Sequence, residues 1–301
     1  MKRVSAQAQS GARHDASVRG PGSETTSRFK FGKNWRAFLT VLDDARIDEA
    51  ERSLREMLRV PDLQGRSFLD VGSGSGLFSL AARRLGAQVH SFDYDRASVE
   101  CTRELRRRYF SNERQWVVEQ GSILDTAYLT TLGTFDVVYS WGVLHHTGAM
   151  WQALDNIWRV VSPGGMLYIS IYNDQGRRSR YWTVVKRTYN RLPEATRFLV
   201  LAPAFILLWG PTFLRDTLLG DPLRSWRCYG GVRGMHPWRD LVDWVGGYPF
   251  EVATPDKIFE FFRATGFNLV TLKTVGGSLG CNEFVFERVA GAGKLSGLTR
   301  Q

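Results

Sequence analysis

The chain is 301 residues long, which allows two domains or one domain with a large insertion. Hydrophobic residues make up 43% of the sequence and charged residues 23%, and these values exclude collagen, a coiled coil or a wholly disordered chain. Three cysteines without a CxxC pair exclude a disulfide scaffold and favour a reducing cytoplasm. The basic start of the chain lacks the apolar stretch of a secretory signal.

The net charge of +10 is concentrated in two segments. Residues 1–33 contain seven basic and two acidic residues, and residues 174–235 contain eleven and four. The rest of the chain is close to neutral. Such segments suit a polyanion or an anionic membrane surface. The alternative is that they solubilise a tail and a helix face.

The first sixty residues predict an arm followed by a helix. Residues 1–27 are rich in Ser, Gly, Ala and Arg, and we expect a disordered basic arm. Apolar residues recur at helical spacing over 44–58, and Pro61 follows. We therefore expect an N-terminal helical lid at 28–60.

An alternation of strands and helices follows at 61–173. Short apolar runs predict five strands, and amphipathic runs predict three helices between them. The strands are expected at 67–71, 88–92, 115–119, 135–139 and 166–172, the helices at 77–85, 97–109 and 150–161, and a turn at 162–165. This alternation specifies an α/β fold with a parallel, doubly wound sheet.

The alternation stops after Asn173 and resumes near Thr254. Residues 174–253 are apolar, aromatic and basic, and we expect a helical cap insertion there. Thr254 and Pro255 suit the start of a helix that continues to residue 265. Two strands follow, at 267–275 and 283–289, and their short link predicts an antiparallel hairpin. Residues 254–290 therefore complete the domain begun at 61, and 291–301 form a flexible tail.

A glycine-rich turn follows the first predicted strand, in the sequence Asp70-Val71-Gly72-Ser73-Gly74-Ser75-Gly76. Glycines let the backbone turn tightly and approach a ligand, and the next helix presents free N–H groups there. The GxGxxG fingerprint of dinucleotide enzymes would need a glycine where Leu77 stands, so a dehydrogenase is disfavoured. The acid before the glycines favours a ligand with a cationic end, such as the methionine part of S-adenosylmethionine.

Two further features follow the next strands. Asp93 ends the second strand, where a carboxylate can accept both hydrogen bonds of a ribose diol. Ser122 and Ile123 follow the third strand, where an adenine can lie between Ile123 and Tyr94. Taken in order after successive strands, these features favour nucleoside binding over ordinary turn chemistry.

Residues 66–173 resemble a class I S-adenosylmethionine-dependent methyltransferase. The segments 69–76, 92–95, 135–146 and 161–165 match four motifs of that superfamily. The pattern is most similar to small-molecule methyltransferases, including those of quinone biosynthesis.

The resemblance implies a seven-stranded Rossmann-like sheet of order 3-2-1-4-5-7-6 and S-adenosylmethionine as the cofactor. Together with the residues discussed above, it gives one set of candidate cofactor contacts. These are Asp70, Gly72, Ser73, Gly74, Gly76, Asp93, Tyr94, Ser122, Ile123, Ser140 and Trp141.

Two adjacent histidines, His145 and His146, follow the fourth predicted strand. Ligands of open parallel sheets bind beyond the carboxyl ends of the strands, and histidine titrates near neutral pH. We favour His146 as the catalytic base because it fills the histidine position of a Val-Leu-x-His pattern, with His145 as second choice. Either one can instead orient the next helix. The remaining histidines are scattered, so we expect no metal.

Aromatic and ionisable residues outside the motifs are candidates for acceptor binding. For the loop residues among them, a purely structural role is the alternative. The candidates are Trp35, Tyr172, His236, Asp243, Tyr248, Glu251 and Asn282. The last of these belongs to the hairpin link, which we expect to overhang the site.

Residues 198–214 carry no charge. Proline and glycine interrupt the segment, which makes it short and broken for a membrane span. Its neighbours Lys186, Arg187, Arg191, Arg197 and Arg215 are basic. Apolar and basic residues together suit an element at a membrane interface, or else a helical cap that packs on the sheet and roofs the site. The two can coexist if a lipid-like acceptor enters from the bilayer.

The sequence therefore predicts an enzyme that O-methylates a small or lipid-like acceptor: a phenol, a quinol or a sugar. We expect it in the cytoplasm, with the inner face of an anionic membrane as a partner. An RNA methyltransferase is the alternative, but nucleic acid is disfavoured because the basic insertion is interleaved with an apolar run instead of stacking platforms. A binding module without activity is a third hypothesis, and the paired histidines argue against it.

Overall fold

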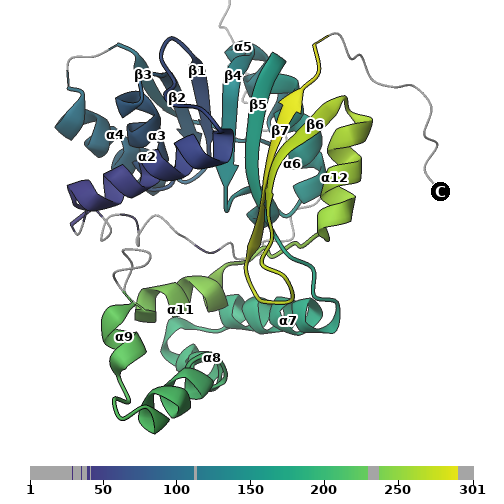
Figure 1. The fold of residues 1–301 in the computed structure, drawn as a ribbon. Coiled ribbons are helices and arrows are strands. Elements are labelled where there is room, and N and C mark those ends of the chain that lie inside the picture. The colour runs from purple at the N-terminus through teal and green to yellow at the C-terminus, as the bar shows by residue number, and fades with distance from the viewer. Residues whose placement is uncertain are drawn as a thin grey trace, which may run out of the picture.

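The computed structural model describes residues 29, 35, 39–40, 42–111, 114–229 and 237–290. A twisted sheet with helices on both faces forms the larger part, and a group of helices lies beyond one end of the sheet (Figure 1). The arm predicted at 1–27 and the tail predicted at 291–301 lie outside the described residues.

The sheet has seven strands in the order β3-β2-β1-β4-β5-β7-β6, which confirms the predicted order. The first five pair in parallel, and β7 is antiparallel to both of its neighbours, which confirms the hairpin. The strands are β1 (Ser67–Val71), β2 (Gln88–Asp93), β3 (Trp116–Gln120), β4 (Phe135–Trp141), β5 (Val161–Tyr172), β6 (Phe267–Lys273) and β7 (Cys281–Arg288).

Alternate residues of the central strands supply two separate cores, because successive side chains of a strand point to opposite faces. Phe68 and Val137 belong to one core, and Leu69 and Val138 to the other. The first core is covered by α2 (Asp44–Leu58), α3 (Leu77–Arg84) and α4 (Arg96–Tyr109). The second is covered by α5 (Thr126–Leu132), α6 (Met150–Ile157) and α12 (Pro255–Ala264). Because helices cover both faces of the sheet, the central strands are continuous apolar runs in the sequence.

The helical insertion predicted after Asn173 is present, and we call it the cap. It consists of α7 (Arg177–Arg191), α8 (Phe198–Leu218), α9 (Arg224–Cys228) and α11 (Pro237–Gly246). Side chains of α7, α8 and α11 share a third core around Trp182 and Val245. The two ends of the cap meet, because Asn173 and Ala253 form an isolated bridge.

Two local predictions differ from the structure. The turn predicted at 162–165 is part of β5, which pairs with β4 across a register shift between Phe135 and Val137. A Cβ at Gly165 would lie 2.9 Å from the Ser162 carbonyl oxygen, so glycine permits this close approach. Helix α5 was not predicted, and it begins where the Asp125 side chain accepts a hydrogen bond from the Tyr128 N–H.

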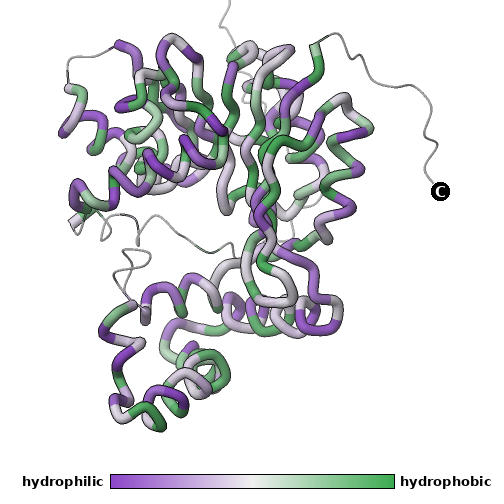
Figure 2. Tube along the Cα trace, viewed as in Figure 1, coloured by the Kyte–Doolittle hydropathy of each residue, from purple (hydrophilic) through white to green (hydrophobic). Residues whose placement is uncertain are grey.

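The apolar segment predicted to be short and broken is one continuous helix, α8, which runs through Pro203 and Pro211. Each proline removes one backbone hydrogen bond, and the helix tolerates both losses. Figure 2 shows hydrophobic residues along α8, at the edge of the cap. By length and composition alone, the helix over Glu194–Leu218 could cross a membrane. Only 6% of its 18-residue apolar stretch is buried in the structure.

Candidate active site

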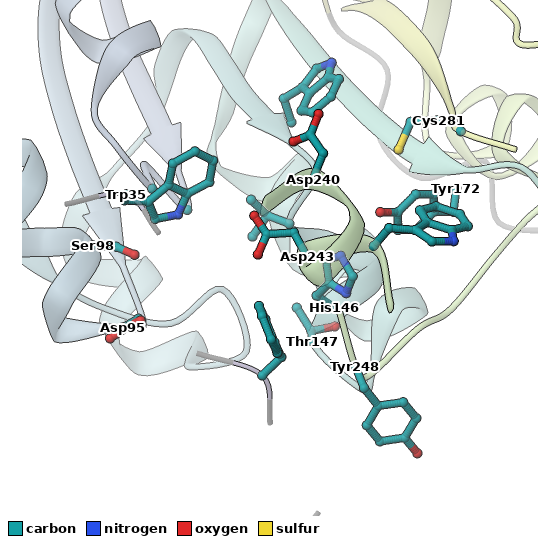
Figure 3. A pocket seen from close by; sticks show the side chains of 18 of the residues that line it. Trp35, Asp95, Ser98, His146, Thr147, Tyr172, Asp240, Asp243, Tyr248 and Cys281 are labelled. Carbon is teal, nitrogen blue, oxygen red and sulfur yellow. The ribbon is translucent and has the colours of Figure 1, made fainter. Parts of the chain in front are cut away.

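A cavity of about 700 Å³ lies between the carboxyl ends of the strands and the cap. Its walls come from the turns after β1, β2, β3 and β4, from α8 and α11, and from the link between β6 and β7. Figure 3 shows side chains from the sheet side and from the cap projecting toward the same space. The cavity therefore joins the two parts of the molecule.

The glycine turn forms one wall and is fixed by close contacts. Gly72 has a φ of +80°, and a Cβ there would lie 2.5 Å from the side chain of Val143. Gly74 has a φ of +54° and lies against the ring of Trp35. Only glycine adopts these conformations without strain, so the turn can bring its backbone to a ligand.

Asp93 lies at the end of β2 and faces the cavity. Its carboxylate accepts hydrogen bonds from the Gly74 N–H at 2.9 Å and the Asp95 N–H at 2.8 Å. Burial raises the pKa of Asp93 to about 6, and these hydrogen bonds oppose the rise. The group therefore stays largely ionised at neutral pH and can accept hydrogen bonds from a ribose diol.

Seven of the eleven predicted cofactor contacts line the cavity: Gly72, Gly74, Asp93, Tyr94, Ser122, Ile123 and Trp141. The other four, Asp70, Ser73, Gly76 and Ser140, do not line it. Their contacts with neighbouring residues support the glycine turn from behind.

Asp70 is buried and accepts a hydrogen bond from the Ser79 hydroxyl at 2.5 Å. Burial raises the pKa of Asp70 to about 7. The Ser140 hydroxyl donates to the Val71 carbonyl at 3.0 Å, which ties β4 to the end of β1. Ser73 shares a hydrogen bond with Thr102 at 2.9 Å. These contacts hold the turn in place.

His146 lines the cavity beside the glycine turn. Its Nδ1 lies 2.6 Å from the Pro249 carbonyl oxygen, and a carbonyl can only accept, so Nδ1 carries the proton. The neutral ring then has an unprotonated Nε2, which suits a general base.

His145, the second choice, is fully buried and does not line the cavity. Among the residues that the structure describes, neither ring nitrogen has a partner in good hydrogen-bond geometry. Burial, with His146 and Lys186 adding to it, holds the pKa of His145 well below its usual range. Its ring lies 4.1 Å from the ring of Tyr172, so His145 is placed as a neutral packing group behind the cavity wall.

The predicted acceptor residues divide into two groups. Trp35, Tyr172, Asp243 and Tyr248 line the cavity, whereas Glu251 and Asn282 do not. Glu251 accepts hydrogen bonds from the Met150 N–H at the start of α6. Asn282 bonds to Asn173 and Val275, where it closes the hairpin link. His236 lies outside the described residues.

Several lining residues were not predicted from the sequence, among them Phe29, Asp95, Ser98, Thr147, Tyr229 and Asp240. Asp95 stands two residues after Asp93 in the same motif, so a signal for it existed. The apolar segment 198–214 was expected to roof the site, and Leu208, Trp209 and Thr212 of that segment line the cavity. Tyr229 and Asp240 had no such signal in the sequence. The overhang of the hairpin link is confirmed, since Leu279, Gly280 and Cys281 line the cavity.

A buried lysine lies behind the side of the cavity that Tyr172 and Trp244 line. Lys186 of α7 has no exposed surface and donates a hydrogen bond to the Trp244 carbonyl. Its Nζ lies 4.2 Å from the centre of the Trp244 ring and 4.7 Å from that of Phe250. Burial lowers the pKa of Lys186 to about 7, with Cys281 and Asp243 opposing the shift. An aromatic surround of this kind suits a cation.

The groups on the sheet side of the cavity fit a nucleoside, whereas Asp70, expected to face a cationic end of the ligand, does not line the cavity. Asp93 offers the acceptor for a ribose, Ile123 and Tyr94 offer apolar surfaces for an adenine, and the glycines leave room for close approach. Residues 69–169 match the family model described as Methyltransferase domain.

Known proteins point the same way. Ubiquinone biosynthesis O-methyltransferase from Xanthomonas oryzae pv. oryzae is 32% identical over 212 residues, or 67% of this chain and 77% of that protein. Ribosomal protein L11 methyltransferase from Helicobacter hepaticus is 39% identical over 72 residues, or 24% of this chain and 22% of that protein.

Among solved structures, PKMT2 from Rickettsia typhi in complex with AdoHcy has a TM-score of 0.51 at 13% identity. The match covers 79% of this chain and 52% of that one, and it bears on the fold alone. The curated relative and the family model carry the assignment. The chain belongs to the class I S-adenosylmethionine-dependent methyltransferases.

Proposed function

We propose that this methyltransferase O-methylates a small or lipid-like acceptor, with a phenol, a quinol or a sugar hydroxyl as the nucleophile. The observation that carries the proposal is the placement of His146, whose ring faces the cavity and is oriented by the Pro249 carbonyl at 2.6 Å. The similarity to an enzyme named for ubiquinone biosynthesis supports the same acceptor class.

S-Adenosylmethionine supplies an electrophilic methyl group when it is bound. Asp93, Tyr94 and Ile123, with Gly72 and Gly74, would hold it along the ends of β1, β2 and β3. Nδ1 of His146 donates its proton in the hydrogen bond to the Pro249 carbonyl, so Nε2 is the atom that would take the proton of the acceptor hydroxyl. Proton removal makes the oxygen a stronger nucleophile, and such a base contributes about 10²–10⁴ in rate.

Aromatic side chains orient the acceptor. Tyr172 and Trp244 meet edge to face with ring centres 5.4 Å apart, and both line the cavity. Trp35 and Tyr248 line it as well. Flat apolar walls bind a ring and exclude water, and a fixed orientation keeps the nucleophile near the transferred methyl group.

The cap also supports a membrane as the source of a lipid-like acceptor, at the inner face of the cytoplasmic membrane. One side of α8 exposes Leu199, Ile206 and Leu214, while Leu208 and Trp209 of the same helix line the cavity. The exposed residues Arg177, Arg178, Arg180, Arg187 and Arg191 of α7 add positive charge to the cap. An apolar face beside basic residues suits the surface of an anionic bilayer.

The experiment is a screen with methyl-labelled cofactor against phenol, quinol, glycan, lipid and RNA pools at several salt concentrations. We expect label in the phenol, quinol, glycan or lipid pool, with little dependence on salt. Label in RNA that falls steeply with added salt would support the alternative, because phosphate contacts release counterions. Label in none of the pools, from protein that binds the cofactor, would contradict the proposed acceptor class.

A further inference from the structure

Trp35 lies on the glycine turn at the wall of the cavity. Its ring lines the cavity, is half-buried and packs against the first core of the sheet domain. A Cβ at Gly74 would lie 3.1 Å from Cε2 of the indole and 3.2 Å from Nε1, so the absence of a side chain at 74 lets the ring come this close. The core and the turn together hold an indole at this wall.

The contacts of Gly74 place Trp35 beside the expected ribose. The Gly74 N–H donates to Asp93 at 2.9 Å, and Asp93 is the carboxylate that suits the ribose diol. Figure 3 shows Trp35 and Asp95 on one side of the cavity and Tyr172 on the other. Trp35 therefore lies on the cofactor side of the cavity, although the sequence placed it among the candidates for acceptor binding.

The cofactor carries a positive charge next to its ribose. The sulfonium sulfur is bonded to the 5′ carbon of that sugar, so a ribose held by Asp93 brings the charge to the wall that Trp35 forms. Asp70, the acid expected to meet this charge, is buried behind the turn and bonded to Ser79. An indole attracts a cation that lies over its ring within about 6 Å, more strongly than the other aromatic side chains do.

We propose that Trp35 recognises the positive charge of the cofactor's sulfonium through its indole ring, and so distinguishes S-adenosylmethionine from S-adenosylhomocysteine. The inference goes beyond the proposed function, because it holds for any acceptor. Methyl transfer leaves the bonding electron pair on sulfur, which becomes a neutral thioether. Trp35 therefore attracts the cofactor before the transfer and loses that attraction after it, which favours release of the product.

A ring that only packed against the cofactor would act differently on the two ligands. They share the adenine, the ribose and the amino-acid end, and they differ in one methyl group and in the charge on sulfur. Apolar contact, or a hydrogen bond from the indole N–H to a shared group, would stabilise both ligands, whereas attraction to a cation stabilises the sulfonium form alone. The ratio of the two dissociation constants therefore reports on the charge.

The experiment measures both ligands by calorimetry on the full chain, with Trp35→Leu and Trp35→Phe as the variants. Leucine keeps an apolar side chain without a π-system, so S-adenosylmethionine should bind about tenfold more weakly to Trp35→Leu, and S-adenosylhomocysteine should change by less than about threefold. Trp35→Phe should give an intermediate ratio, because a phenyl ring attracts cations less strongly than an indole. Trp151→Leu is the matched control, since Trp151 is exposed on α6 and does not line the cavity.

Equal weakening of both ligands in the Trp35 variants would make the indole a packing group and overturn the inference. Unchanged binding of S-adenosylmethionine, or a greater loss for S-adenosylhomocysteine, would overturn it as well. If circular dichroism shows that Trp35→Leu does not fold, Trp35→Phe decides, and a ratio equal to that of the wild type contradicts the inference. Neither measurement uses an acceptor, so this result and the outcome of the acceptor screen are independent.

Discussion

The sheet domain and the cap place polar and apolar side chains in opposite ways. In the sheet domain, one group of buried polar side chains is hydrogen-bonded within itself: Ser79 bonds to Asp70 and to Ser91, and Trp116 donates to Ser91. In the cap, a lysine is fully buried, while Ile206 is 69% exposed and Leu218 is 80% exposed. The cap therefore exposes what the sheet domain buries.

The difference separates residues that stabilise the fold from residues that serve binding. Burying a lysine disfavours its charged form, and exposing leucine and isoleucine forgoes the free energy of their burial. Large exposed apolar patches on proteins mark interaction sites. The hydrogen-bonded polar groups of the sheet domain contribute to its stability, whereas the exposed apolar residues of the cap support the proposed contact with a membrane.

The largest effect is expected at the edge of the sheet domain, from His146→Ala. Turnover should fall by about 100-fold or more, because the base is lost, while the affinity for cofactor stays nearly unchanged. Wild-type turnover should also fall as the pH is lowered through the range in which histidines become protonated. Rates and calorimetry are measured on the same preparations, with His90→Ala as the control, since His90 contacts Glu119 away from the cavity. An equal loss of cofactor affinity would make His146 a structural residue.

The second effect tests whether cofactor binding belongs to the sheet domain alone. Asp93→Ala removes a carboxylate whose hydrogen bonds are each worth about 1.5–3 kcal/mol, so calorimetry should show at least tenfold weaker binding of S-adenosylmethionine. The exposed Asp44 provides the control, as Asp44→Asn. Unchanged affinity in Asp93→Ala would show that the Asp93 carboxylate does not bind the ribose of the cofactor.

The third effect tests the buried charge of the cap. The pKa of Lys186 is about 7 in the folded protein, below the ordinary value of 10.5, so the unfolded chain binds more protons between these values. Stability should therefore rise with pH from about 7 upward, by at most about 1.4 kcal/mol per pH unit. Lys186→Met should remove that rise in urea unfolding between pH 7 and 9, whereas the exposed Lys257→Met should keep it. A rise that persists in Lys186→Met would assign it to other groups.

The smallest effect concerns the exposed face of α8. Cosedimentation should be greater with anionic than with neutral vesicles, because each basic residue near the surface contributes about 1 kcal/mol. The pair Ile206→Ser and Leu214→Ser should lower it a few-fold, and Arg191→Glu should reduce the preference for anionic lipid. Leu272→Ser, on an exposed position of β6, is the matched control. If the wild-type protein cosediments with neither type of vesicle, α8 serves only as part of the cap and does not bind a membrane.

The sheet domain was predictable from the sequence because its signals are local. The apolar run around Phe68 and Leu69, the glycines at 72 and 74 and the acid at 93 each follow from the chemistry of one strand or turn. The position of His146 at the carboxyl end of β4 was likewise predicted. The prediction that Glu251 and Asn282 belong to the site was wrong, because each is held by hydrogen bonds to residues that are distant in the sequence.

The cap was predictable only as a helical segment. Proline suggested that α8 would be broken, yet the helix continues through both prolines. Trp209, Tyr229 and Asp240 line the same cavity because separate parts of the cap pack together. Their spacing in the sequence does not indicate a shared site. Lys186 gave no sign of burial either, since a lysine in a basic helix is ordinarily solvated.

The joined ends of the cap have a consequence for how such an enzyme changes over time. The Ala253 N–H donates to the Tyr172 carbonyl at 3.0 Å, and Asn173 bridges to Ala253, so the insertion leaves and re-enters the sheet domain at one point. A segment attached in this way can be lengthened, shortened or exchanged without altering the path of any strand. The fold can therefore acquire a new acceptor by replacing one module, while the glycine turn and Asp93 continue unchanged.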